Sequence, residues 1–261
     1  MRHCNQLNTT VRTIAVCLSL FAIALTAQPA SAACSNGNLN GAYGYLSARL
    51  DGNAKTGTPF ALVGRFVADG HGTITNGSET ANLFGNNVGK SQFAGLYSIS
   101  ANCTGSMTLG GSRYNIVLDD NDTAFQMTAA DQGNLRNGFG YPVGTQGCGL
   151  SGTQTYATNL LGYGNTQSLT DEAAVGQLVV LGSGELTGTE TVSVAFEVQT
   201  SVPLAGRYTP NADCTGSLQI VPQQGSGLPT MNFSTVAVNN GTELLLVSTD
   251  TGTEVGGTAQ Q

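Results

Sequence analysis

Residues 93–109 read FAGLYSISANCTGSMTL and residues 204–220 read LAGRYTPNADCTGSLQI, so one pattern occurs twice in this chain of 261 residues. The two copies align without a gap, and the offset between their cysteines is 111 residues. Each copy places two β-rich stretches around a short cysteine-containing turn. We therefore predict two copies of one β-rich unit. The shared residues are, in the first copy, Ala94, Gly95, Tyr97, Ala101, Cys103, Thr104, Gly105 and Ser106.

The repeat extends well beyond this stretch. LNG at residues 39–41 matches LSG at residues 150–152, and GSET at 77–80 matches GTET at 188–191. Each copy offers about eight short strands, joined by turns too short for crossover helices, which is typical of an antiparallel meander. Closing such a meander removes its exposed edges. The sequence predicts an all-β fold of two tandem antiparallel meander β-barrels, with a β-sandwich as the alternative.

The first residues have the pattern of an export signal. A basic start precedes an apolar run at residues 14–27, and small residues follow at the positions that signal peptidase requires. We expect residues 1–32 to be a signal peptide, cleaved after Ala32. The alternative is a lipoprotein signal with Cys34 as the acylated residue.

The repeat also sets the expected domain boundaries. We predict a first barrel at residues 33–141, a linker at residues 142–147 and a second barrel at residues 148–261. Since the linker PVGTQG is short, we expect the two barrels to pack closely.

Composition limits the classes of partner. Loss of Arg2 and Arg12 with the signal leaves seven basic against 16 acidic side chains, a net charge of −9. Such an acidic chain does not suit nucleic acid or anionic lipid. After the signal, no apolar run is long enough for a transmembrane segment. At 40% hydrophobic residues, the chain can fill a core.

Four cysteines remain after the signal is removed, and an even number in an exported protein indicates disulfides. Each copy has one cysteine before its first strand and one in its CTGS turn. We therefore predict the pairs Cys34–Cys103 and Cys148–Cys214. A zinc site is the rival interpretation, but the chain has no CxxC pair, and His71 is its one histidine after the signal.

Few residues suggest chemistry. Glu79 and Glu190 are the acids that coincide between the copies, and so do the tyrosines Tyr97 and Tyr208. We expect the two glutamates on the outer face of each barrel, although an inward carboxylate could bind or catalyse. The two tyrosines suit a core or barrel-rim position, with a hydrogen bond to a ligand as the alternative. These four residues are our weak candidates for ligand binding.

Motifs for catalysis, cofactors or metals are missing from the sequence. There is no G-x-S-x-G elbow and no P-loop, and a Ser-His-Asp triad could use His71 alone. The acidic residues 119–122 resemble the start of a calcium loop but lack its later glycine and glutamate, so we expect a hairpin tip. We predict no catalytic residue, no cofactor and no metal site.

The motifs L-x-G-x-Y from Leu39, V-G-R-F-x-A-D-G-x-G from Val63, F-x-G-x-Y from Phe93 and C-T-G-S-M-T-L from Cys103 resemble secreted bacterial tandem β-barrel repeat proteins of unassigned function. The outline is also similar to lipocalin-like and allene-oxide-cyclase-like barrels. That resemblance implies barrel interiors of the kind that hold apolar ligands.

Together these features predict a secreted or periplasmic/cell-envelope protein. We expect a non-enzymatic role, structural or binding, with an envelope component or a small apolar molecule as the partner. One alternative is a carrier with the ligand in a barrel interior. The other is an isomerase- or cyclase-like enzyme on the same fold, with Glu79 as its acid or base.

Overall fold

The computed structural model describes residues 33–51, 58–119, 123–132, 134–144, 148, 152–165, 170–195 and 197–261. The predicted signal peptide, part of the predicted linker and part of the acidic hairpin tip lie outside the described residues. Residues Cys34–Gln261 form one compact unit. The boundary between the two predicted barrel domains therefore stays a prediction.

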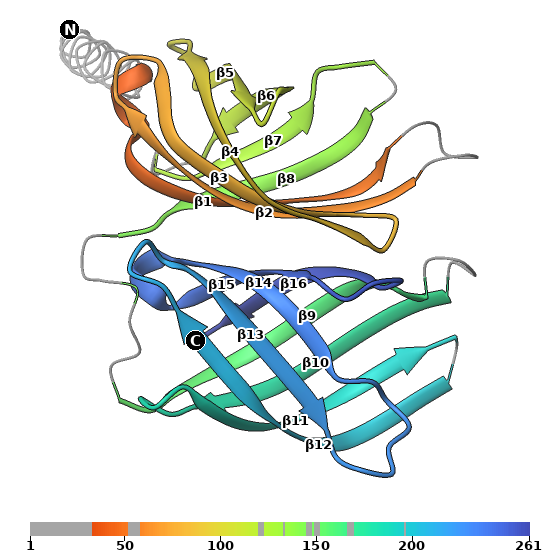
Figure 1. Cartoon of the computed structure of the whole chain (residues 1–261). Helices are drawn as coiled ribbons and strands as arrows, with labels where there is room; N and C mark the ends of the chain where they lie inside the picture. Colours follow the sequence, from red (N-terminus) through yellow and green to blue (C-terminus); the bar gives the residue numbers. More distant parts are fainter. Residues whose placement is uncertain are drawn as a thin grey trace, which may run out of the picture. The chain divides into compact units, whose positions relative to one another are not determined.

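The first half of this unit is a closed barrel in which each strand pairs with the next in the chain and β8 returns to β1 (Figure 1). All the pairings are antiparallel, as a meander requires. A short 3-10 turn, Asn36–Asn38, precedes the barrel. The strands are β1 (Asn40–Asp51), β2 (Thr58–Asp69), β3 (Thr73–Leu83), β4 (Asn86–Ile99), β5 (Thr104–Leu109), β6 (Ser112–Leu118), β7 (Phe125–Ala129) and β8 (Asn134–Pro142).

The second half repeats this topology as a second closed barrel, in which β9 pairs with both β10 and β16. A 3-10 turn, Asn239–Gly241, connects β14 to β15. The prediction of two antiparallel meander barrels is thus confirmed. The strands are β9 (Gln154–Asn165), β10 (Thr170–Val180), β11 (Glu185–Val194), β12 (Glu197–Pro210), β13 (Thr215–Pro222), β14 (Met231–Val238), β15 (Glu243–Ser248) and β16 (Glu254–Gln260).

The repeated CTGS turn has the same backbone in both barrels. Cys103 and Cys214 both adopt left-handed φ angles, of 65° and 67°. Each forms the predicted disulfide, Cys34–Cys103 across 69 residues and Cys148–Cys214 across 66 residues. The repeat was therefore sufficient to choose the correct pairing among the three possible ones.

Aromatic rings fill the first barrel. Tyr43 stacks on Phe66 with ring centroids 5.6 Å apart, and Phe125 contacts both rings at 6.1 Å. Tyr45 lies 5.9 Å from Phe66 and meets Phe93 edge to face at 6.4 Å. This ring cluster occupies the centre of the barrel with side chains of the protein itself.

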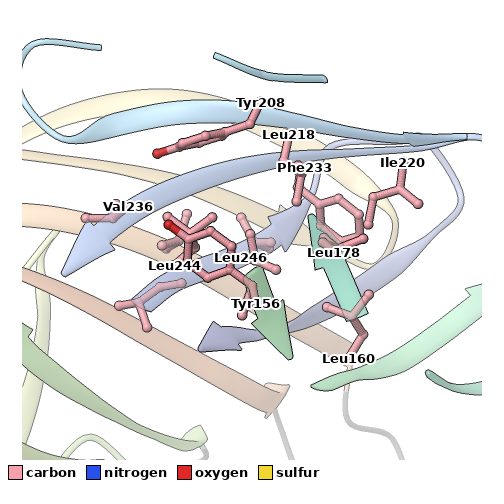
Figure 2. Packing of buried hydrophobic residues seen from close by; sticks show 14 of the residues in the cluster. Tyr156, Leu160, Leu178, Tyr208, Leu218, Ile220, Phe233, Val236, Leu244 and Leu246 are labelled. Atoms are coloured by element: carbon pink, nitrogen blue, oxygen red, sulfur yellow. The ribbon is translucent and has the colours of Figure 1, made fainter. Parts of the chain in front are cut away.

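The second barrel is filled mainly by aliphatic side chains, with the rings of Tyr156, Tyr208 and Phe233 among them (Figure 2). Strand β15 is buried along its whole length. Leu244 and Leu246 belong to the barrel interior, whereas Leu245 and Val247 alternate with them on the other face of the strand. Burial of both faces means that the outer wall of this barrel is covered too.

The outer wall is covered by the first barrel. One apolar cluster contains Leu46, Ala61 and Val63 of the first barrel together with the core of the second. The two walls approach closely at Gly44, because a Cβ atom there would lie 2.5 Å from Cγ1 of Val238. This contact agrees with the close packing that the short linker predicts.

A buried amide joins the same two walls. The Nδ2 atom of Asn82 on β3 donates to the carbonyl oxygens of Ser248, at 2.9 Å, and Thr253, at 2.7 Å. The Asn82 side chain is 0% exposed. Because a buried amide must find partners inside the protein, these bonds fix how β3 lies against the β15–β16 turn.

We predict that Asn82→Ala lowers the free energy of unfolding by about 2–3 kcal/mol, since it removes the hydrogen bonds to the carbonyl oxygens of Ser248 and Thr253 and empties a buried position. Denaturant unfolding of the full chain measures this change. The control is Asn86→Ala, an exposed amide at the start of β4, which we expect to change stability by less than about 0.5 kcal/mol. Equal stability of the two variants would contradict the role of Asn82.

Candidate functional site

Glu79 points into the first barrel, so the prediction of an outer position is wrong. Tyr45, Gly64 and Glu79 face one another across β1, β2 and β3. The ring of Tyr45 lies over Gly64, where a Cβ atom would come within 2.5 Å of the tyrosine Cζ. The Tyr45 hydroxyl then donates to Oε2 of Glu79 at 2.7 Å. This partner allows an inward carboxylate, and burial, followed by the charge of Glu79, raises the pKa of Tyr45.

Glu190 also points inward, on the same side of β11 as Leu186 and Val192, and is 3% exposed. The outer position is therefore wrong for this residue as well. On the neighbouring strands, Glu190 is paired with Gly176, and Gly176 is paired with Thr158. The short side chain of Thr158 therefore takes the place that Tyr45 has in the first barrel. Oε1 of Glu190 has no hydrogen-bond partner among the described residues. Burial, with a smaller contribution from Glu172, raises the pKa of Glu190 to about 7.

Glu172 is a second inward acid that the sequence analysis did not single out. It is 8% exposed, and burial raises its pKa. Gly64 of the first copy and Gly176 of the second are 112 residues apart. At the same offset, Phe60 of the first copy corresponds to Glu172 of the second, and Phe60 is a core residue of the first barrel. That match was the available signal that this acid lies inside. The second barrel thus holds two neighbouring acids with raised pKa values.

The two tyrosine candidates lie in different surroundings. The hydroxyl of Tyr97 donates to the carbonyl oxygens of Leu39, at 2.7 Å, and Asn36, at 3.1 Å, so it holds the 3-10 turn against the barrel. The hydroxyl of Tyr208 is buried with no partner in the described part of the chain, and burial raises its pKa to about 12. Neither tyrosine lines the cavities described below, and their role in ligand binding stays a prediction.

Among the described residues, cavities of two sizes are lined by both barrels. The smaller, of about 250 Å³, is lined mostly by polar residues of both barrels, among them Glu79, Lys90 and Asn211. The Glu79 carboxylate itself is held by Tyr45 and, at 3.4 Å, by the hydroxyl of Ser91. Lys90 lies 3.7 Å from Asp213 in an exposed ion pair across the barrels.

The larger cavity, of about 530 Å³, is called the inter-barrel pocket below. One wall belongs to β1, β7 and β8 of the first barrel and the other to β9, β10 and β16 of the second. Its apolar lining comes from both barrels. The residues that matter most are Leu46, Ala48, Phe139, Leu161, Tyr163 and Glu254.

A row of polar side chains crosses the second-barrel wall of this pocket. Tyr163 on β9 faces Asp171 on β10 and Glu254 on β16. Asp171 is exposed, whereas Glu254 is 5% exposed and its Oε2 has no hydrogen-bond partner in the described structure. Burial raises the pKa of Glu254 to about 8. The pocket therefore combines apolar walls with a largely buried acid, one of whose carboxyl oxygens has no hydrogen-bond partner among the described residues.

No motif in the sequence indicates this pocket. Glu254 and Asp171 have no matching acid in the first copy, and the pocket residues are spread over six strands. Among the described residues, no group of three or more His, Cys, Asp or Glu side chains could hold a metal ion. No helix in the described part of the chain is long and apolar enough to cross a membrane.

Each barrel has the lipocalin-like outline that the sequence resembles. No protein-family model and no curated protein matches the chain. Among solved structures, isotype 1 transferrin binding protein B from serogroup B Neisseria meningitidis is similar at 8% identity and a TM-score of 0.37, over 84% of this chain and 74% of that one. Kievitone hydratase from Nectria haematococca is similar at 8% identity and a TM-score of 0.29, over 89% and 94%. These similarities concern the arrangement of strands.

We predict that Glu190 makes the stability of the protein depend on pH. The folded-state pKa of about 7 lies above the ordinary value of 4.5, so the unfolded chain releases its proton first as pH rises. The free energy of unfolding should therefore fall between about pH 4.5 and pH 7, by on the order of 3 kcal/mol for this residue.

Denaturant unfolding of Glu190→Gln across this pH range checks the prediction, because the amide cannot ionise and this residue's share of the slope should disappear while the shares of Glu172 and Glu254 remain. Glu185→Gln, at an exposed position on the same strand, is the matched control and should keep the slope of the unmodified protein. An unchanged slope in Glu190→Gln would contradict the buried position of this carboxyl.

Proposed function

We propose that this protein is an extracytoplasmic binding protein that holds a small, mainly apolar ligand in the inter-barrel pocket. The observation that carries the proposal is the pocket itself. Its volume of about 530 Å³ lies within the range of about 300–1,000 Å³ that is usual for small-molecule sites. Apolar walls with a few polar groups, at the junction of two barrels, are also typical of such sites.

The packed interiors favour this place over the barrel interiors. Tyr43, Phe66 and Phe125 form the central ring cluster of the first barrel. Leu178, Leu218 and other apolar side chains fill the second (Figure 2). An apolar ligand inside either barrel would have to displace these well-packed side chains, which costs free energy. The inter-barrel pocket takes a ligand without that cost.

The disulfides support the proposed location. Cys34–Cys103 and Cys148–Cys214 are both formed, and disulfides persist mainly in oxidising compartments. The signal peptide predicted at residues 1–32 agrees with secretion, or with a periplasmic or cell-envelope location. A binding role there, with a small apolar molecule as the partner, accounts for the pocket.

The contacts of Glu79 favour binding over catalysis. A general acid or base must reach the proton of its substrate. The Glu79 carboxylate instead accepts hydrogen bonds from Tyr45 and Ser91, and its Oε2 lies 2.7 Å from the buried tyrosine hydroxyl. The isomerase- or cyclase-like alternative therefore has less support than a binding role.

We predict that the full chain binds the neutral apolar dye N-phenyl-1-naphthylamine, with a rise in dye fluorescence. Ala48→Trp should weaken binding at least tenfold, because the indole fills the pocket beside Phe139. Val117→Trp, at a position on β6 that is 51% exposed and outside the pocket, is the matched control and should bind as the unmodified protein does. Absence of dye binding, or equal binding by Ala48→Trp, would overturn the proposed function.

A further inference from the structure

We propose that the ligand of the inter-barrel pocket carries a basic amine on an apolar body, and that Glu254 and Asp171 recognise this amine. The inference rests on the proposed function and names the chemical class of the ligand. The two acids come from β16 and β10, which are the strands on either side of β9. They therefore face the pocket from two sides of Tyr163.

The state of Glu254 is the main evidence. Glu254 is one of the residues that line the pocket and is 5% exposed, and Oε2 of its carboxyl accepts no hydrogen bond from the described residues. A buried polar atom without a partner costs free energy, and such atoms are rare in folded proteins. A cationic ligand group in the pocket would give this carboxyl a favourable charge partner.

The charge of the pocket favours a cationic donor. Among the described residues that line it, none is Lys, Arg or His, whereas Asp171 and Glu254 are both acids. Tyr163 places an aromatic side chain between them, and aromatic rings attract ammonium groups through cation–π contact. An anionic ligand would meet two carboxyl groups with no compensating base.

The apolar walls favour an organic cation over a metal ion. Hard divalent cations need six or more oxygen ligands. Leu46, Phe139 and Leu161 provide hydrocarbon surface instead. A molecule that places its amine near Glu254 and its apolar body against these three side chains satisfies both parts of the pocket.

Amine binding should then depend on pH. With the pKa of Glu254 raised to about 8, its carboxyl is protonated at lower pH and must release that proton to water before it pairs with an ammonium group. Tyr163 on β9 and Asp171 on β10 are the titratable groups beside it, and the lining residues from β1, β7 and β8 do not titrate. Affinity for the amine should therefore rise with pH up to about 8.

The test uses two probes of equal shape, 1-aminoadamantane and 1-adamantanol, which displace the neutral dye from the full-length protein. At pH 8 we expect the amine to bind at least tenfold more tightly than the alcohol. At pH 6 this preference should be at least tenfold smaller, while the affinity for the alcohol stays constant. Equal affinities at pH 8, or no displacement by either probe, would overturn the amine inference.

The variant Glu254→Gln should abolish the preference for the amine and its pH dependence while keeping the affinity for the alcohol. Glu185→Gln, which removes an exposed acid outside the pocket, is the matched control and should keep both. If Glu254→Gln no longer binds the dye, Asp171→Asn replaces it: a reduced preference supports the inference, and an unchanged one overturns it. Failure of the unmodified protein to bind the dye would instead refute the proposed function.

Discussion

The structure depends on the burial of one apolar wall against another. Leu245 and Val247 lie on the outer face of the second barrel, and β15 packs against β1, β2 and β3 of the first. At about 25 cal/mol for each Å² removed from water, an apolar contact of this kind is a large part of the stability of a small protein. Gly44 allows the walls to approach, since any side chain there would collide with Val238. Leu46 belongs both to this apolar contact and to the lining of the inter-barrel pocket.

Duplication gave two barrels with the same outline and different polar interiors. In the first, the long side chain of Tyr45 crosses Gly64 and satisfies Glu79. In the second, Thr158 is too short for this bond, and Glu190 keeps an oxygen without a partner. The length of the facing side chain therefore decides whether the inward carboxyl has a tyrosine as its hydrogen-bond donor.

Two buried polar side chains near the β15–β16 turn, Asn82 and Glu254, differ in what they contact. Asn82 uses its amide to attach the first barrel to Ser248 and Thr253, and its donor bonds are buried and formed. Glu254 lies beside the same β15–β16 turn, yet Oε2 of its carboxyl has no partner in the described structure. Asn82 thus ties β3 to the β15–β16 turn through its two donor bonds, whereas Glu254 lines the inter-barrel pocket.

The sequence alone determined the repeat, the antiparallel barrels and the disulfide pairing, because these follow from local turn residues and from the equal spacing of the cysteines. Burial on both faces of β15 was also readable in its uninterrupted LLLV, which lacks the alternation of a half-exposed strand. The tertiary structure decided the face of Glu79 and Glu190, since strand alternation fixes relative and not absolute sides. It alone placed Glu254 beside Leu46, because contact between two barrels joins residues that no local pattern connects.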